Sequence, residues 1–78
     1  MKTITLLSAK LNQVYVVESI VGLPGSVKRR LLQFGIIKNA RIIVENRAWG
    51  SSTQIISVMG SKIAIDSKIA GGIMVYYV

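Results

Sequence analysis

Apolar residues recur with helical spacing in only one stretch of the chain, residues 25–40. Val27, Leu31 and Phe34 stand at positions i, i+4 and i+7 of this stretch. Such spacing places apolar side chains along one face of a helix and leaves the intervening charged and polar residues on the other. The pattern therefore predicts a short amphipathic helix, about residues 26–35, packed against a sheet.

The same stretch contains start and stop signals for a helix. Ser26 is a predicted N-cap, because its hydroxyl can accept a hydrogen bond from an unpaired N–H group of the first turn. Gly35 follows the last periodic residue and suits the left-handed conformation of a C′ position, where Ile36 would supply the accompanying hydrophobic contact. We therefore expect about two helical turns.

The rest of the chain consists of short segments rich in β-branched and aromatic residues, separated by turn residues. Five of these segments are predicted strands: Val14–Val21, Ala40–Arg47, Thr53–Met59, Lys62–Asp66 and Ile73–Val78. The loop Ala48–Ser52 predicts an antiparallel hairpin between the second and third strands. Single helical turns are predicted near Thr5 or Ser8, and from a cap at Asp66 to Ala70.

Several further positions have predicted conformations or burial. Asn39 is expected in the left-handed conformation of a tight turn. Met59 and Met74 are expected to fill the core. Tyr76 and Tyr77 are neighbours on one strand and must point to opposite faces, so one is expected in the core and the other on the surface. Five short strands and one helix together predict a mainly β fold, a small closed or nearly closed barrel.

Composition narrows the class of protein. A chain of 78 residues predicts a single domain, 1–78, and 51% hydrophobic residues with a mean hydropathy of +0.53 supply a dense core. The absence of Cys and His excludes disulfides and most zinc, copper and iron sites. No apolar run approaches the roughly 20 residues of a membrane helix, and the start has no signal-peptide core. We therefore expect a cytoplasmic protein without a transmembrane segment.

Charge indicates an acidic partner. Ten Lys and Arg residues against three Asp and Glu residues leave a formal net charge of +7. Such a balance favours association with nucleic acid, an anionic membrane face or an acidic protein surface, and charge alone does not choose among them.

Two segments carry a resemblance to a known family. RRLLQFGIIKNARIIVE and the later SKIAIDSKIAGGIMVYY resemble, in order and spacing, the FeoA family of small cytosolic partners of the bacterial ferrous iron transporter FeoB. The matching residues are Arg30, Leu31, Phe34, Gly35, Ile36, Ile63, Ala64, Ile65, Ala70, Ile73 and Val75. The chain departs from the family pattern with Lys38-Asn39 after the helix, with Asn12 before the first strand, and with Phe34 in place of a Leu at an expected core position.

The resemblance implies an SH3-like barrel without catalysis or cofactor. It implies a protein of ferrous iron uptake that binds or regulates FeoB, with transition-metal association at the level of the family only. The same barrel is similar to the C-terminal domain of iron-dependent repressors of the diphtheria-toxin-repressor type, but we expect no DNA-binding domain before it here.

The chain offers little chemistry of its own. Glu18, Glu45 and Asp66 are the only carboxylates, and one on each strand without His or Cys would make a weak, oxygen-only metal site. Solvated strand charges explain them better. No nucleophile and base pair can be assembled, so we expect neither catalytic nor metal-binding residues.

The predicted partner-binding residues are Lys28, Arg29, Arg30 and Trp49. Three cations in the first turn of a helix would oppose its dipole, which suggests a docking face for an acidic partner; the alternative is an ordinary solvated helix face. Arg30 is expected to be partly buried, with its stem along the barrel. Trp49, at the hairpin tip, would be either an exposed anchor for a partner or a lid over one end of the barrel.

Two functions from different classes follow. The first is a non-enzymatic partner or regulator of FeoB that acts by protein–protein binding. The alternative is a nucleic-acid-binding small barrel that uses its basic surface. Strands that are apolar on both faces also predict a homodimer.

Overall fold

The computed structural model describes residues 2–47 and 52–78. Its elements follow the order β1 (Thr3–Thr5), the 3-10 turn η1 (Leu6–Ser8), β2 (Val14–Ile20), α1 (Gly25–Gln33), β3 (Arg41–Arg47), β4 (Thr53–Val58), β5 (Ser61–Asp66), α2 (Ser67–Ala70) and β6 (Ile73–Tyr77). The five predicted strands and the predicted helix are all present within one or two residues. The prediction of a mainly β fold is confirmed.

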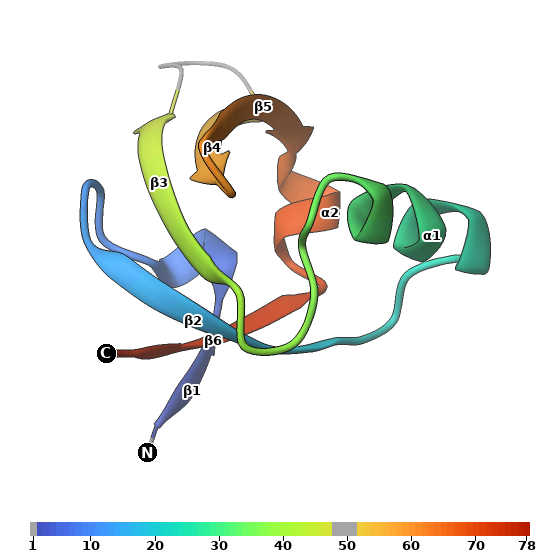
Figure 1. Cartoon of the computed structure of the whole chain (residues 1–78), viewed down its shortest axis with the longest axis horizontal. Coiled ribbons are helices and arrows are strands. Elements are labelled where there is room, and N and C mark those ends of the chain that lie inside the picture. Colours follow the sequence, from blue (N-terminus) through green and yellow to red (C-terminus); the bar gives the residue numbers. More distant parts are fainter. Residues whose placement is uncertain (1, 48–51) are drawn as a thin grey trace.

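All the described strands belong to one antiparallel sheet in the order β1-β6-β2-β3-β4-β5. The sheet bends strongly, with β4 and β5 at one end, β1, β2 and β6 at the other, and α1 projecting from one side (Figure 1). Strand β1 was not predicted, because three residues are too few to show an alternating pattern. It pairs with β6, in the register Thr3 with Tyr76.

The concave side of the sheet contains the core. Its buried hydrophobic residues come from every strand except β1 and from all three helical segments: Leu6, Ala9, Tyr15, Val17, Leu31, Ile36, Ile42, Val44, Ile56, Val58, Ile65, Ala70, Ile73 and Val75. Alternate residues within β2, β3 and β4 are buried, as expected for strands with one face on a packed interior. Burial on this scale is the main source of stability in so small a chain.

Several local predictions are confirmed. Asn39 has φ +75°, and Asn12 also lies in the left-handed region, with φ +62°. The Asp66 side chain accepts a hydrogen bond from the Lys68 N–H at 2.7 Å and caps the single turn of α2. A helical turn follows Thr5, although no side chain caps it.

Two burial predictions are wrong. Met59 is 76% exposed, because it occupies the turn between β4 and β5 with φ +53°, and its side chain lies over Gly35 instead of entering the core. Neither Tyr76 nor Tyr77 is a core residue: Tyr76 is half-buried and Tyr77 is 57% exposed. Ile73 and Val75 are the side chains of β6 that fill the interior.

Arg47 links β3 to the beginning of the chain. Its Nη2 donates hydrogen bonds to the carbonyl oxygens of Leu6, Leu7 and Ala9, at 3.2, 3.1 and 2.6 Å. A bulge between Val44 and Asn46 shifts the pairing of β3 with β4 just before this arginine. The guanidinium thereby holds η1 against the sheet. No helix in the described ranges 2–47 and 52–78 is long and apolar enough to cross a membrane.

Candidate protein-docking surface

Helix α1 begins without a side-chain cap. Pro24 occupies the N-cap position, and no side chain accepts a hydrogen bond from the first turn. The prediction that Ser26 caps the helix is wrong, because the helix already begins at Gly25 and Ser26 lies inside the first turn. Proline presets a φ close to that of a helix, which favours an early start.

The other end of α1 is the predicted glycine stop. Gly35 has φ +87° and donates its N–H to the Leu32 carbonyl oxygen at 3.0 Å. Ile36 donates its N–H to the Leu31 carbonyl oxygen at 2.9 Å. These two bonds define a Schellman motif, and Leu31 and Ile36 are both buried, as the motif favours.

Most apolar residues of the α1 region are not buried. Leu31 is the one buried residue of the helix and Val27 is half-buried, whereas Leu32 is 51% and Phe34 45% exposed. Phe34 was expected in the core as an enlarged Leu, and this is wrong because it falls at the C-cap, after the last helical residue. The exposed apolar side chains make α1 a shallowly packed element.

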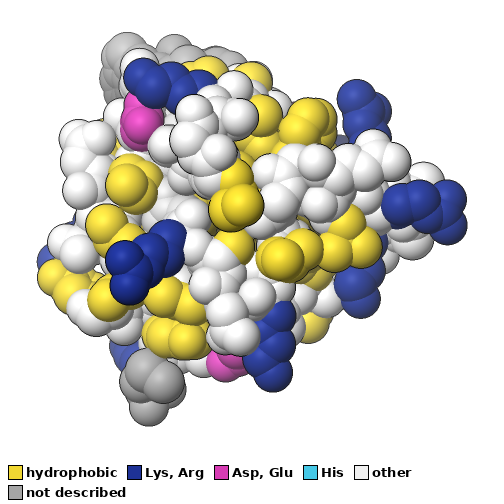
Figure 2. All heavy atoms as spheres, in the orientation of Figure 1, with side chains coloured by type: hydrophobic (Ala, Val, Ile, Leu, Met, Phe, Trp, Pro, Cys, Tyr) yellow, Lys and Arg dark blue, Asp and Glu magenta, His cyan; other side chains and the backbone are white. Residues whose placement is uncertain are grey.

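The three predicted cations occupy different parts of this short helix. Lys28, Arg29 and Arg30 are all exposed. Only Lys28 belongs to the first turn, since the helix begins at Gly25, and Arg30 belongs to the last turn. The expected opposition of all three to the dipole is therefore wrong, because a cation in the last turn is favourable. On the face shown in Figure 2, Lys and Arg side chains surround the α1 end of the molecule beside apolar ones.

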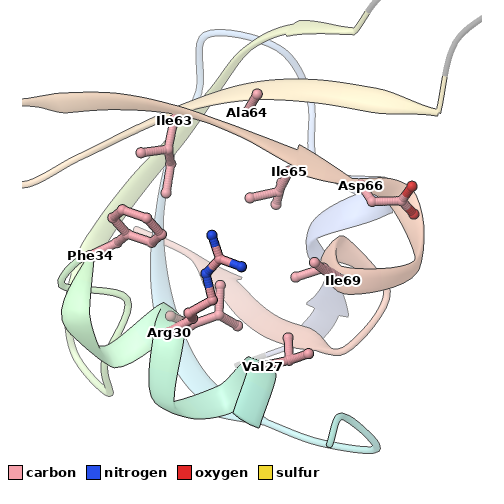
Figure 3. Close-up of a pocket in the computed structure, with 9 residues that line it drawn as sticks. Val27, Arg30, Phe34, Ile63, Ala64, Ile65, Asp66 and Ile69 are labelled. Atoms are coloured by element: carbon pink, nitrogen blue, oxygen red, sulfur yellow. The ribbon is translucent and has the colours of Figure 1, made fainter.

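A groove of about 370 Å³ lies between α1, β5 and α2. We call it the α1–β5 groove. Its lining residues are Val27, Arg30, Leu31, Phe34, Ile63, Ala64, Ile65, Asp66 and Ile69. The side chains of Ile63 and Ile65 point into it from β5, and Ile69 closes one end from α2 (Figure 3). Its walls are thus mainly apolar, with Arg30 and Asp66 as the charged lining residues.

Arg30 introduces a charge into this groove. Its guanidinium points between the isoleucines of β5 and away from the body of the helix (Figure 3). The lining carboxylate, Asp66, is directed elsewhere and accepts hydrogen bonds from the Lys68 N–H at 2.7 Å and the Ser52 hydroxyl at 3.3 Å. Among the described residues, the Arg30 guanidinium has no ion-pair or hydrogen-bond partner. Arg30 is exposed as a whole although it lines the groove, so the expectation that its stem is partly buried stays a prediction.

A second groove, of about 340 Å³, lies on the opposite flank of α1. It is lined by Glu18, Ser19, Ile20, Lys28, Leu32, Ile36, Ile37 and Lys38. The Thr3 hydroxyl donates to Glu18 at 2.6 Å and the Ser19 hydroxyl at 3.2 Å, and these bonds lower the pKa of Glu18 below its ordinary value of 4.5. Glu18 is therefore ionised at neutral pH and offsets part of the charge of Lys38.

The three carboxylates considered as metal ligands have other partners. Glu18 accepts the two hydroxyl hydrogen bonds, Glu45 pairs with the Lys62 ammonium at 3.1 Å, and Asp66 caps α2. Within residues 2–47 and 52–78, no three His, Cys, Asp or Glu side chains gather as a metal site would require.

The predicted partner-binding residues are not brought together. Arg30 lines the α1–β5 groove, Lys28 lines the second groove, and Arg29 lines neither. Trp49 lies outside the described residues. Sequence reasoning missed the contribution of Ile69, which reaches the groove from α2. The sequence offered only a weak signal for this role of Ile69, because it is one apolar residue in a single predicted helical turn.

Comparisons with known proteins place the chain in a family. The FeoA domain profile matches residues 4–77. A crystal structure titled as an iron uptake regulatory protein (FeoA) is 25% identical, has a TM-score of 0.80 and covers 96% of each chain. The solution structure of FeoA from Chlorobium tepidum is 24% identical with a TM-score of 0.88, covering 96% of this chain and 70% of that one.

The same fold occurs inside metal-dependent repressors. A structure titled as a manganese-dependent transcriptional repressor is 17% identical with a TM-score of 0.88, and the match covers 97% of this chain and 42% of that chain. IdeR from T. acidophilum is 23% identical with a TM-score of 0.87, and the match covers all of this chain and 35% of that chain. At this identity the likeness concerns the fold alone. No curated protein matches the chain in sequence. The FeoA neighbours have an SH3-like fold, which confirms the predicted barrel type. The chain belongs to the FeoA family, whose members are small, non-enzymatic proteins associated with ferrous iron transport.

Proposed function

We propose that this chain is a non-enzymatic partner or regulator of the ferrous iron transporter FeoB, acting in the cytoplasm as a single domain over residues 1–78. It binds the cytosolic region of FeoB through the α1–β5 groove. The observation that carries the proposal is a solvent-open apolar groove with an unpaired guanidinium at its centre, on a chain of the FeoA family.

The chemistry of the groove suits an acidic, apolar protein surface. Exposed apolar side chains grouped on one face are typical of interaction sites, and an arginine among them is a common centre of binding energy. A carboxylate of the partner would form charge-assisted hydrogen bonds with the Arg30 guanidinium and replace the water that solvates it. The net charge of +7 would also accelerate encounter with an acidic partner at low salt.

Calorimetric titration with the cytosolic region of the cognate FeoB tests this proposal. We expect Arg30→Glu to weaken binding by at least about tenfold, since it places like charges in contact. Lys10→Glu is the matched control: it changes the net charge equally at an exposed residue that lines neither groove. Absence of binding by the wild-type chain, or equal effects of the two substitutions, would contradict the proposal.

A parallel titration with RNA tests the alternative function, nucleic-acid binding. Single-stranded RNA titrated at about 50 mM and about 300 mM salt gives the general polyanion response of this basic chain. Tight RNA binding that falls steeply with salt, together with no FeoB binding, would favour the alternative function.

A homodimer is compatible with the same surface. Leu32, Phe34, Ile37 and Met59 are between 45% and 76% exposed around α1 and the β4–β5 turn. Sedimentation at high micromolar concentration should show association, and Phe34→Ser should reduce it. A monomer under these conditions would disprove self-association without affecting the FeoB proposal.

A further inference from the structure

Strand β5 forms an open edge of the sheet. It pairs with β4 on one side, and no strand of the described ranges pairs with its other side. Natural proteins seldom leave such an edge unprotected, because its unpaired N–H and C=O groups are a template for another strand. The surroundings of this edge therefore indicate what it can accept.

The α1–β5 groove runs along that edge. Its lining includes four consecutive residues of β5, from Ile63 to Asp66. Successive side chains of a strand point to opposite faces, so a groove on one face would contact only every second residue. The side chain of Ala64 points away from the groove, so Ala64 lines it with its backbone (Figure 3).

The turn that joins β4 to β5 determines which backbone groups face the groove. It consists of Met59 and Gly60, with φ of +53° and +77°, as in a two-residue type I′ hairpin. The flanking residues of such a turn, here Val58 and Ser61, exchange hydrogen bonds, and pairing then alternates along the strand. Ala64, three residues after Ser61, therefore directs its N–H and C=O away from β4.

A contact beyond the end of β5 supports this alternation. Ser67, six residues after Ser61, donates its N–H to the Ser52 carbonyl oxygen at 2.7 Å, in line with β4. The backbone N–H and C=O groups of the odd-numbered residues in this segment thus point toward β4. Those of Lys62 and Ala64 point outward, to the open side of the strand. Ala64 lies between Ile63 and Ile65 in the part of β5 that lines the groove.

The groove specifies what an added strand would carry. One side chain of the added strand would contact an apolar wall made of Ile63, Ile65 and Ile69. A neighbouring side chain of that strand would meet the Arg30 guanidinium, which has no partner among the described residues. The Lys62 ammonium, on the same edge, is already paired with Glu45 at 3.1 Å, so Arg30 supplies the charge that a partner would meet. Such an edge suits an extended segment in which apolar and acidic residues adjoin.

We propose that an extended segment of a partner protein adds as a strand to the open edge of β5, pairing with the backbone of Ala64. It inserts an apolar side chain into the α1–β5 groove and places a carboxylate on Arg30. The inference rests on the proposed function in taking the cytosolic region of FeoB as the partner, and it deepens that proposal by naming the mode of binding. Strand addition gives affinity through main-chain bonds and specificity through alternate side chains.

Ala64→Pro is the direct test. Proline removes the outward N–H of Ala64 but no bond to β4, and such positions on edge strands tolerate proline. Ala64→Ser is the matched control, because it keeps the N–H and nearly the same size. We expect Ala64→Pro to weaken binding of the FeoB cytosolic region by at least about tenfold and Ala64→Ser by less than about twofold. Equal binding by both variants would overturn strand addition.

Hydrogen exchange in the wild-type chain provides a readout that does not depend on the proline variant folding. Binding should slow exchange of the Ala64 amide by at least about tenfold, because that N–H gains a partner. Arg30→Gln should weaken binding more than Arg29→Gln, which removes the same charge beside the groove. An Ala64 amide that exchanges equally fast in the complex would overturn the proposal.

The binding results separate two kinds of failure: strand addition can be wrong while FeoB is the partner, or FeoB can be the wrong partner. If the FeoB region binds wild-type and Ala64→Pro chains equally, FeoB is the partner and strand addition is wrong. If it does not bind at all, FeoB is not the partner, and a library of phage-displayed random peptides of about 12 residues tests the groove itself. Selected peptides should combine apolar and acidic residues and lose binding to Ala64→Pro. Selection of no peptides, or of peptides without acidic residues, would overturn it.

Discussion

Ile42 and Ile37 stand five residues apart in the chain and have opposite environments. Ile42, in β3, is completely buried in the core, whereas Ile37, just after α1, is 46% exposed beside a groove. The same contrast separates the two regions as wholes. The strands bury alternate residues on a closed interior, and the α1 region leaves Leu32, Phe34 and Ile37 about half in solvent.

The difference indicates a division of roles. Burial of the strand residues stabilises a chain that has no disulfide or other covalent link. Exposure of the α1 residues contributes little stability, and it leaves apolar surface and three cations available for a partner. Substitutions in the interior should therefore change folding, and those in the α1 region should change binding. Five predictions test this division, in order of decreasing effect.

The largest effect is expected for Ile42→Ala. It removes a fully buried side chain from the core, and we expect a loss of about 2–5 kcal/mol in the free energy of unfolding. Urea denaturation measures it. Ile37→Ala, the same change in the α1 region, should cost less than about 1 kcal/mol. Similar losses at the two positions would show that the α1 region contributes to stability as the interior does.

Arg47→Met should be the next largest. It keeps much of the apolar stem but removes the hydrogen bonds to the carbonyl oxygens of Leu6, Leu7 and Ala9, which we expect to cost about 1.5–3 kcal/mol. Hydrogen exchange should accelerate first in η1, the segment that Arg47 holds, and in β1 just before it. Arg41→Met, at an exposed position of the same strand, is the control and should leave both measurements nearly unchanged.

The two glycines at the ends of α1 should respond to alanine with opposite signs. Gly35→Ala forces a left-handed residue to carry a Cβ, at a cost of about 1–2 kcal/mol. Gly25→Ala meets open space in a helical conformation and should stabilise by about 0.4–1 kcal/mol. Thermal unfolding of both variants measures the difference.

A double variant separates backbone strain from contact at Gly35. The added Cβ would lie 2.7 Å from Cγ of Met59, a flexible and exposed side chain that can move away. Met59→Ala in the Gly35→Ala background should therefore restore little stability. Full restoration would show that the clash, and not the positive φ, causes the loss.

Ser26→Glu should stabilise α1 without affecting the interior. No acidic residue occupies the first turn of this helix, so a carboxylate there should gain about 0.3–1 kcal/mol from the helix dipole at low salt. The gain should shrink at high ionic strength. Ser26→Gln is the uncharged control, and an equal gain with it would exclude an electrostatic cause.

The smallest effect concerns the titration of Glu18. Its folded pKa is lowered mainly by the hydrogen bond from Thr3, so its contribution to stability is present above the ordinary pKa of 4.5 and is lost as pH falls through the folded pKa. Thr3→Val should raise the pKa of Glu18, measured by carboxyl NMR titration. The stability difference between Thr3→Val and wild type should also narrow at acidic pH. An unchanged Glu18 pKa would show that the Thr3 hydrogen bond does not stabilise the carboxylate.

Local sequence patterns determined the elements of this protein. The 3.6-residue period of Val27 and Leu31, the left-handed glycine at position 35 and the cap at Asp66 act over a few neighbouring residues, and they predicted α1, its end and α2. Strand β1 and the exposed position of Met59 escaped prediction. A three-residue strand shows no period, and the turn geometry of Met59 overrode its hydrophobicity.

Only the tertiary structure decided the site. Arg30, Ile63 and Ile69 come from three elements, and nothing in their spacing shows that one guanidinium lies among these isoleucines. The open edge of β5 depends on the strand order of the whole sheet, which no local pattern encodes. The spacing of apolar residues along the sequence indicates which face of a helix or strand is apolar. Which elements meet, and which apolar faces stay uncovered, follows from the packing of the whole chain.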